Sequence, residues 1–211
     1  MRKIFQLLLA VVIVGLIYTI YVQISTPIRF EEEKAQKDAA VIERIKSIRL
    51  CERAFKSKYQ QFTGNFDSLI NFVLYDSLEM ERKIYDEDDS LGMALLKKEK
   101  RQNVEKFTVA VIDTVFAPAR LTPDQVKALR YVPFTEDKVE YILSAGKITT
   151  ESKVVIPIVE CRVPYIMYLD TVQYRQEIIN LIDNDVNNFN KYPGIKFGSM
   201  EGGNNEAGNW E

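Results

Sequence analysis

The chain has 211 residues, and its 28 basic and 30 acidic side chains leave a net charge of −2, which does not favour nucleic acid as a partner. It contains no histidine and only two cysteines. These counts exclude a Ser-His-Asp triad, a Cys-His pair, a histidine-based zinc site and a four-cysteine zinc site. We therefore expect no catalytic residues, no metal site and no cofactor.

An uncharged apolar run covers residues 4–24, directly after Arg2 and Lys3. At about 1.5 Å per residue, a helix of this length measures about 31 Å and matches the hydrocarbon core of a bilayer. We predict a transmembrane signal anchor over residues 4–25, rather than a cleaved signal peptide or a buried core helix. No A-x-A-like cleavage site follows the run, and buried helices are seldom apolar for so long. The span is marked by Ile4, Leu8, Val12, Leu16, Ile20 and Ile24.

The charges that flank the span predict its orientation. Two basic residues precede it, and three consecutive glutamates, beginning at Glu31, follow it. Because basic flanks stay on the cytoplasmic side, residues 1–3 should be cytoplasmic and the main domain extracytoplasmic. We expect a single-pass protein of the plasma (inner) membrane, with the lipid bilayer as its first partner.

Residues 26–62 predict a stalk beyond the membrane. Pro27 should bend or break the first helix, since proline lacks a backbone donor and crowds the preceding turn. A second helix over residues 30–59 follows, free of glycine and proline. Its apolar residues recur every three or four positions and form one stripe, which either the later sheet or a partner helix should cover. We assign packing or partner contacts in this stripe to Val41, Ile45, Ile48, Phe55 and Tyr59.

Residues 63–199 predict an α+β head. Asn65 should cap a short helix over residues 66–75, and the charged residues 76–103 indicate a solvated helical or loop excursion. Residues 105–116 are rich in β-branched and aromatic side chains, which is typical of a buried strand. Thr122 should then cap a short helix in a capping box.

The second half of the head predicts a mostly antiparallel sheet packed on the long helix. We expect a hairpin of residues 138–144 and 153–162 with its turn at 145–147, and a further strand at 164–169. Two prolines, Pro157 and Pro164, favour edge or bulge positions for these strands. A helix over 174–189 and a final strand over 195–199 complete the head.

The remaining candidates for chemistry are few. No phosphate-binding glycine loop occurs. A disulfide between Cys51 and Cys161 is one option in an oxidising compartment, and two free thiols are the other, since one pair is no framework. The polar tail, residues 200–211, is most simply a solvated end. The alternative is that its oxygen-rich side chains form a calcium-binding loop. Trp210 in this tail would dock onto the sheet, contact another protein or remain loose.

Residues 4–62 resemble the architecture of type IV pilins and type II secretion pseudopilins, with an apolar helix, a proline and an amphipathic continuation. Residues 48–70 (IRLCERAFKSKYQQFTGNFDSLI) are similar to the passage in which a pilin helix ends and the chain enters its head. The chain departs from that family in one respect, because no acidic residue precedes Glu31 and the peptidase motif is absent. The later half also resembles single-span envelope proteins without an assigned activity.

Two function classes follow from these patterns. The first is a non-enzymatic, membrane-anchored envelope protein, as a structural or tethering component of a secretion or surface-filament assembly, with other envelope proteins as partners and self-association as a further option. The second is a membrane-anchored extracytoplasmic enzyme that uses carboxylates. An enzyme should present a deep cleft with converging polar groups, whereas a tether should present an exposed apolar patch or an unpaired sheet edge.

Overall fold

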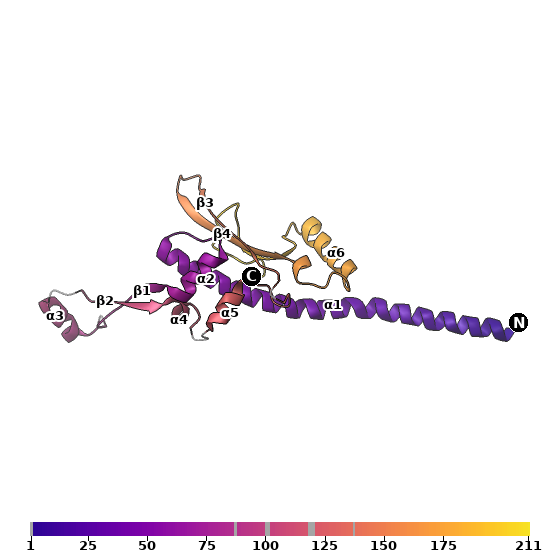
Figure 1. Cartoon of the computed structure of the whole chain (residues 1–211). Helices are drawn as coiled ribbons and strands as arrows, with labels where there is room; N and C mark the ends of the chain where they lie inside the picture. The colour runs from indigo at the N-terminus through magenta and orange to yellow at the C-terminus, as the bar shows by residue number, and fades with distance from the viewer. Residues whose placement is uncertain (1, 87, 100–101, 118–120, 137) are drawn as a thin grey trace.

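The structure is a computed structural model that describes residues 2–86, 88–99, 102–117, 121–136 and 138–211. Within these ranges it has a long N-terminal helix, short helices and two antiparallel sheets, so the predicted α+β fold is confirmed. Figure 1 shows that α1 (Arg2–Tyr59) is the spine of the molecule. Its N-terminal half protrudes at one end, the head packs around its C-terminal half, and a narrow arm extends beyond the other end.

The helix α1 runs without interruption for 58 residues, and Pro27 lies inside it. The prediction that Pro27 could break the helix is therefore wrong. A proline removes one backbone donor, while the remaining bonds of so long a helix stay in place on both sides. Nearby hydroxyls add bonds to this part of the helix, since Thr26 Oγ1 donates to the carbonyl of Val22 at 2.8 Å. The apolar run and the predicted stalk are consequently one continuous helix.

The head sheet consists of three antiparallel strands in the order β3-β4-β5, namely β3 (Ile142–Thr149), β4 (Val155–Pro164) and β5 (Gly194–Gly198). The final strand is confirmed. The predicted turn at 145–147 is wrong, because Gly146 lies within β3 opposite Ile158 and the chain turns at residues 150–154. Because Gly146 has no Cβ, it leaves room for Met200, whose Cε lies 3.1 Å from the position that a Cβ would occupy.

The two prolines of the sheet do not mark an edge strand, because β4 is the central strand. Its pairing with β5 covers only residues 160–164, so Pro157 lies where β3 is the sole neighbour. The predicted strand at 164–169 is also wrong, since a 3-10 turn, η2 (Tyr165–Met167), follows β4. This turn lets Tyr168 reach α1, where its hydroxyl bonds Asp38 Oδ1 at 2.5 Å.

Three short helices agree with the sequence predictions. Asn65 caps α2 (Phe66–Tyr75) by accepting from the backbone N–H groups of residues 67 and 68. Thr122 and Gln125 form the predicted capping box at the start of α5 (Pro123–Lys127), which η1 (Ala128–Arg130) continues. Near the C-terminal end of the chain, α6 (Arg175–Asp183) passes into a π-helical turn, η3 (Asn184–Asn188).

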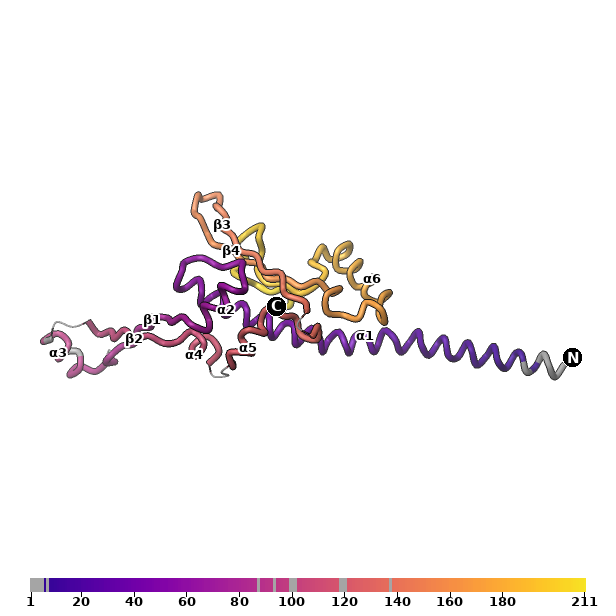
Figure 2. Tube along the Cα trace, viewed as in Figure 1, coloured from indigo at the N-terminus to yellow at the C-terminus, as the bar shows by residue number. Residues whose placement is uncertain are grey.

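The predicted buried strand over 105–116 is shorter and more exposed than expected. Among the described residues, strand β2 (Glu105–Ala110) pairs only with β1 (Ser77–Arg82), which lies in the segment predicted as a solvated excursion. The chain then enters the core as α4 (Val111–Val115), where Val111 is fully buried. The excursion also carries α3 (Ser90–Glu99), and together these elements make the arm that projects from the head in Figures 1 and 2.

Candidate functional site

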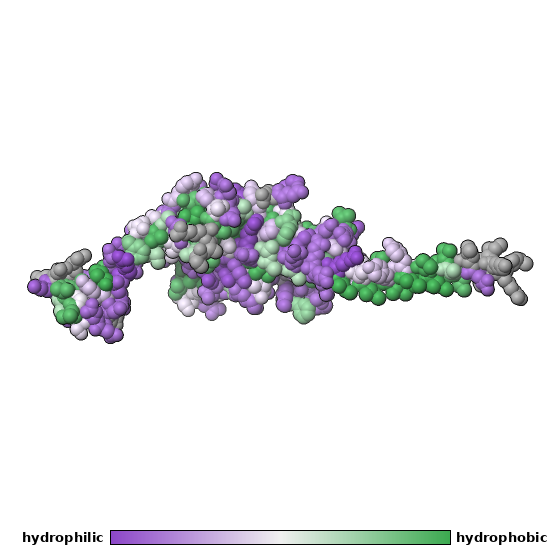
Figure 3. Space-filling model, turned by 90° about the horizontal axis from the view of Figure 1, so that it is seen from below, coloured by the Kyte–Doolittle hydropathy of each residue, from purple (hydrophilic) through white to green (hydrophobic). Residues whose placement is uncertain are grey.

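The N-terminal part of α1 is the one helix of the described chain that is long and apolar enough to cross a membrane. None of its apolar window is buried by the head, and Leu8, Val12, Leu16, Ile20 and Ile24 are each 47–59 % exposed. The side chain of Ile4 lies outside the described residues. Figure 3 shows this run as a band of hydrophobic surface along the protruding helix. The prediction of an apolar span is confirmed at the level of length, composition and exposure.

The amphipathic stripe of α1 is covered by the chain's own head. Val41, Ile45 and Ile48 are fully buried within one hydrophobic core. Phe55 is partly buried and meets the ring of Phe72 edge-on at 5.1 Å. Tyr59 departs from the expectation because it is 46 % exposed, and its hydroxyl donates to Asp76 at 2.7 Å. Of the two alternatives for the stripe, the structure shows intramolecular packing.

Both cysteines are free and completely buried, so the predicted disulfide is not present. Cys51 lies on the stripe of α1, and Cys161 lies on the central strand β4. Burial raises the pKa of each thiol well above its ordinary value. Neutral, enclosed thiols are poor nucleophiles, so these cysteines act here as small core residues.

A buried acid, Glu52, was missed by the sequence analysis. It is fully buried beside Cys51, and its Oε2 accepts from the N–H of Thr63 at 3.1 Å. Its Oε1 has no hydrogen-bond partner among the described residues. Burial raises the pKa of Glu52 to about 8, so the carboxyl is mostly protonated at neutral pH. The available sequence signal was its spacing, four positions after Ile48 and three before Phe55, on the apolar stripe.

The C-terminal tail is docked rather than solvated and loose. Phe197 of β5 forms a bridge with Gly208, and Trp210 packs against the core with the guanidinium of Arg49 at 5.7 Å from its ring. Glu206 binds Arg53 at 3.1 Å and Lys56 at 3.3 Å. The tail therefore lies along the basic side of α1. Both oxygens of Glu206 are committed to these cations, which leaves this carboxylate unsuited to calcium.

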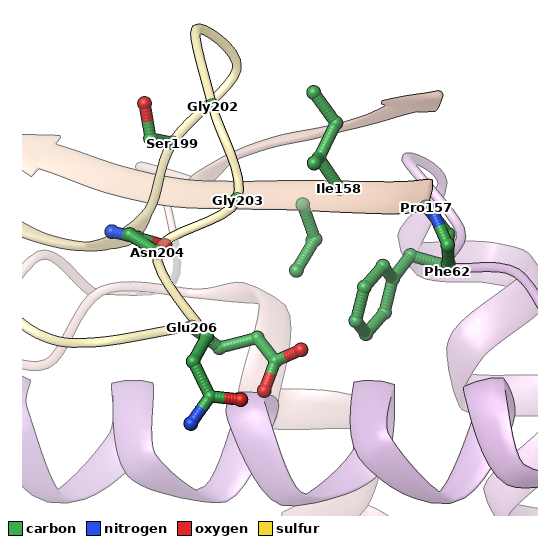
Figure 4. Close-up of a pocket in the computed structure, with 10 residues that line it drawn as sticks. Phe62, Pro157, Ile158, Ser199, Gly202, Gly203, Asn204 and Glu206 are labelled. Carbon is green, nitrogen blue, oxygen red and sulfur yellow. The ribbon is translucent and has the colours of Figure 1, made fainter. Parts of the chain in front are cut away.

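A small pocket of about 20 Å³ lies under the tail, between Phe62, Ile158 and Glu206. Figure 4 shows the loop with Gly203 and Glu206 passing between β4 and α1. The volume suits about one water molecule and no substrate. Among the described residues, no three His, Cys, Asp or Glu side chains gather as a metal-binding group.

A larger groove of about 630 Å³ lies where α6 meets α1. The apolar residues of its lining are Pro27, Phe30, Ala35 and Leu181. The polar and charged residues of its lining are Glu31, Lys34, Glu177, Asn180 and Asn184. The groove is anchored by the ring contact of buried Phe30 with Tyr174, at 5.4 Å between centroids. Of the head elements, α6 lies nearest to the protruding part of α1 (Figure 1). The sequence analysis did not identify this groove, because its two walls are about 150 residues apart along the chain.

The arm offers a different surface. Within the described residues, β1 and β2 pair only with each other, so each has a free edge. Met80 and Phe107 occupy facing positions of the hairpin and are 39 % and 37 % exposed. Leu91 and Leu95 of α3 are also exposed. A free edge with apolar side chains is the feature expected of a protein-binding surface.

Comparisons of the chain with protein-family models, with curated proteins and with solved structures find no match. The function must therefore be argued from the geometry of the chain itself.

Proposed function

We propose that this chain is a single-pass membrane protein, held by α1 with its N-terminus in the cytoplasm, and that its extracytoplasmic head is a non-enzymatic structural or tethering part of an envelope assembly. The proposal rests on one observation. The apolar run of α1 is left uncovered by the head, although the same helix continues into the core of the head. An apolar surface of this size is stable only in contact with lipid or another apolar partner.

The shape of the chain supports a tethering role. From Ile24 to Tyr59 the helix rises about 50 Å, at about 1.5 Å per residue, and the arm begins near the far end of this rod. The anchor and the arm thus lie at opposite ends of one rigid element. Such an arrangement presents the arm at a fixed height above the membrane.

The arm is the surface that we assign to a partner in the envelope. Its free strand edges suit addition of a strand from another protein, and Met80 and Phe107 supply apolar side chains at that hairpin. A second copy of the chain is the other occupant of the same edge. The likeness to pilins and pseudopilins supports an assembly of the secretion or surface-filament type.

Membrane topology is tested with the variant Ser152→Cys, which places a thiol on the exposed β3–β4 turn. Both native cysteines are buried, so the unmodified chain is the matched background control. We expect a membrane-impermeant maleimide to label the variant in right-side-out vesicles. Labelling only after the vesicles are opened would place the head in the cytoplasm and contradict the proposal.

The tethering role is tested by photo-crosslinking in intact membranes. A benzophenone amino acid replaces Phe107 on the arm or, as the control, Phe134, which is 61 % exposed away from the arm. We expect a discrete protein adduct from position 107 and none from position 134. Absence of an adduct at position 107, or the same adduct from both positions, would argue against the arm as the partner surface.

A further inference from the structure

The groove between α1 and α6 lies at the height of lipid headgroups if α1 spans the bilayer. Pro27, at the edge of the groove, is three residues past Ile24, which corresponds to about 5 Å along the helix. The headgroup layer on each side of a bilayer is about 5–7 Å thick. The open groove therefore begins within this layer and continues above it.

The groove contains negative charge that the protein does not neutralise. Glu31 and Glu177 both line it, and neither forms an ion pair with any residue that the structure describes. On α1, Glu33 differs in this respect, since it pairs with Lys37 at 2.7 Å. Glu32 forms no ion pair with a described residue either, but it lies outside the groove lining. Two uncommitted carboxylates, one from each wall, favour a ligand that carries an ammonium group.

Hydrogen-bond donors lie along the same groove. The amide oxygen of Asn180 accepts from Gln176 at 2.9 Å, and that of Asn184 accepts from Asn188 at 2.7 Å. These bonds leave the amide N–H groups of Asn180 and Asn184 available. The free donors are these amides, because the ammonium of Lys34 already bonds Asp38 at 2.5 Å, on the side away from the membrane. Such donors suit the oxygens of a phosphate.

We propose that this groove binds the phosphoethanolamine headgroup of a membrane phospholipid. The ammonium of the headgroup lies between Glu31 and Glu177, and its phosphate accepts from the amides of Asn180 and Asn184. Pro27, the apolar residue of the lining nearest the bilayer, contacts the glycerol, while the acyl chains stay in the hydrocarbon core. Phe30 and Leu181 contact the methylene groups of the ethanolamine. A volume of about 630 Å³ lies in the range of small-ligand sites. The π-helical turn that begins at Asn184 widens α6 at this point, as π-turns commonly do at binding sites.

This inference rests on the proposed membrane anchor, because the anchor brings the groove to the lipid. It is tested on the full chain in dodecyl maltoside, with native mass spectrometry after titration with dihexanoyl-phosphatidylethanolamine. The comparison lipids are the phosphatidylcholine, whose trimethylammonium has no N–H, and the phosphatidylglycerol, which has no cation. The variant Glu31→Gln/Glu177→Gln removes both charges at constant side-chain size, and Glu32→Gln is the matched control on α1 outside the groove lining.

We expect one ethanolamine lipid per chain, bound about tenfold more tightly than the other two lipids. This preference should be lost in the double variant and kept in Glu32→Gln. Far-UV circular dichroism confirms that the variants are folded. Equal binding of the three lipids, or an equal loss in Glu32→Gln, would overturn the inference. Equal binding of free phosphoethanolamine would overturn the assignment to a lipid. If the full-length chain resists extraction from membranes but shows no lipid preference, the proposed membrane anchor stands and only the lipid site in the groove is refuted.

Discussion

Replacement of Glu52 by glutamine should change how the stability of the head depends on pH. Burial raises the pKa of Glu52 from 4.5 to about 8, so the native state holds this proton more tightly than the unfolded chain. Below pH 4.5 both states are protonated, and stability is unaffected by the group. As the pH rises toward 8 the unfolded chain ionises first, and stability falls. Above pH 8 the loss is complete.

The size of the effect follows from the two pKa values. A difference of about 3.5 between them corresponds to a loss of about 5 kcal/mol, at about 1.36 kcal/mol for each pKa unit. About 2.5 kcal/mol of this loss falls between pH 6 and pH 9. Because the chain contains no histidine, the side chain that ordinarily titrates between pH 5 and 8 does not obscure the measurement.

The assay is urea unfolding of the full chain in detergent, followed by fluorescence. Trp210 is the sole tryptophan and packs against the core, so its emission reports the unfolding of the head. We expect stability to fall from pH 6 to pH 9 in the wild-type chain and to fall far less in Glu52→Gln, where the raised pKa values of the two buried cysteines contribute only near pH 9. Glu43→Gln, at an exposed position of the same helix, is the control and should keep the wild-type slope. Parallel curves for wild type and Glu52→Gln would refute the assignment of a buried, protonated acid.

Three further substitutions test the packing of the head on α1. Ile48→Asp places a charge at a fully buried position and should destabilise the head by at least about 3 kcal/mol in the same unfolding assay. Unchanged stability would show that the stripe is not covered. Thr122→Ala removes the capping box of α5 and should cost about 1 kcal/mol, whereas Thr122→Ser should retain most of the stability. Glu206→Gln weakens the ion pairs with Arg53 and Lys56 and should lower the free energy of unfolding by about 1 kcal/mol at low salt. A loss of stability that does not decrease with added salt would contradict an electrostatic role.

The parts of the fold that follow from short-range interactions were predictable. The caps at Asn65 and Thr122 involve side chains and backbone groups two or three residues apart. The apolar stripe of α1 is likewise a property of one helix, and its spacing identified the buried positions Val41, Ile45 and Ile48. These features depend little on which other elements the chain brings nearby.

The errors concern partners that lie far apart in the sequence. The composition of residues 105–116 predicted a buried strand, yet β2 ends at Ala110, pairs only with β1 among the described residues and stands away from the core. The sequence around Gly146 predicts a turn, but the register places Gly146 opposite Ile158, where its missing Cβ leaves room for Met200. Composition records how apolar or flexible a segment is, and it does not record which strand pairs with it.

The tail and the candidate sites were missed for a related reason. A Gly/Asn-rich end predicts solvation, and docking of Trp210 on the sheet was one of three alternatives for that residue. In the structure, Glu206 and Trp210 dock on basic residues of α1 about 150 positions earlier, which the sequence did not indicate. Glu52 looked like one more polar residue of a charged helix, although its position on the stripe was visible. The groove exists only because α6 folds back on α1 near Pro27, so neither segment alone indicates it.

The most direct test of the central claim is extraction of the full chain from membranes with alkaline carbonate. We predict that the wild-type chain remains in the membrane pellet, because the uncovered run of α1 is long and apolar enough to span a bilayer. A variant with Val12→Asp and Leu16→Asp should be released, since each carboxylate at the centre of the span costs about 3 kcal/mol. Recovery of the wild-type chain in the soluble fraction would contradict the membrane anchor and the functions that depend on it.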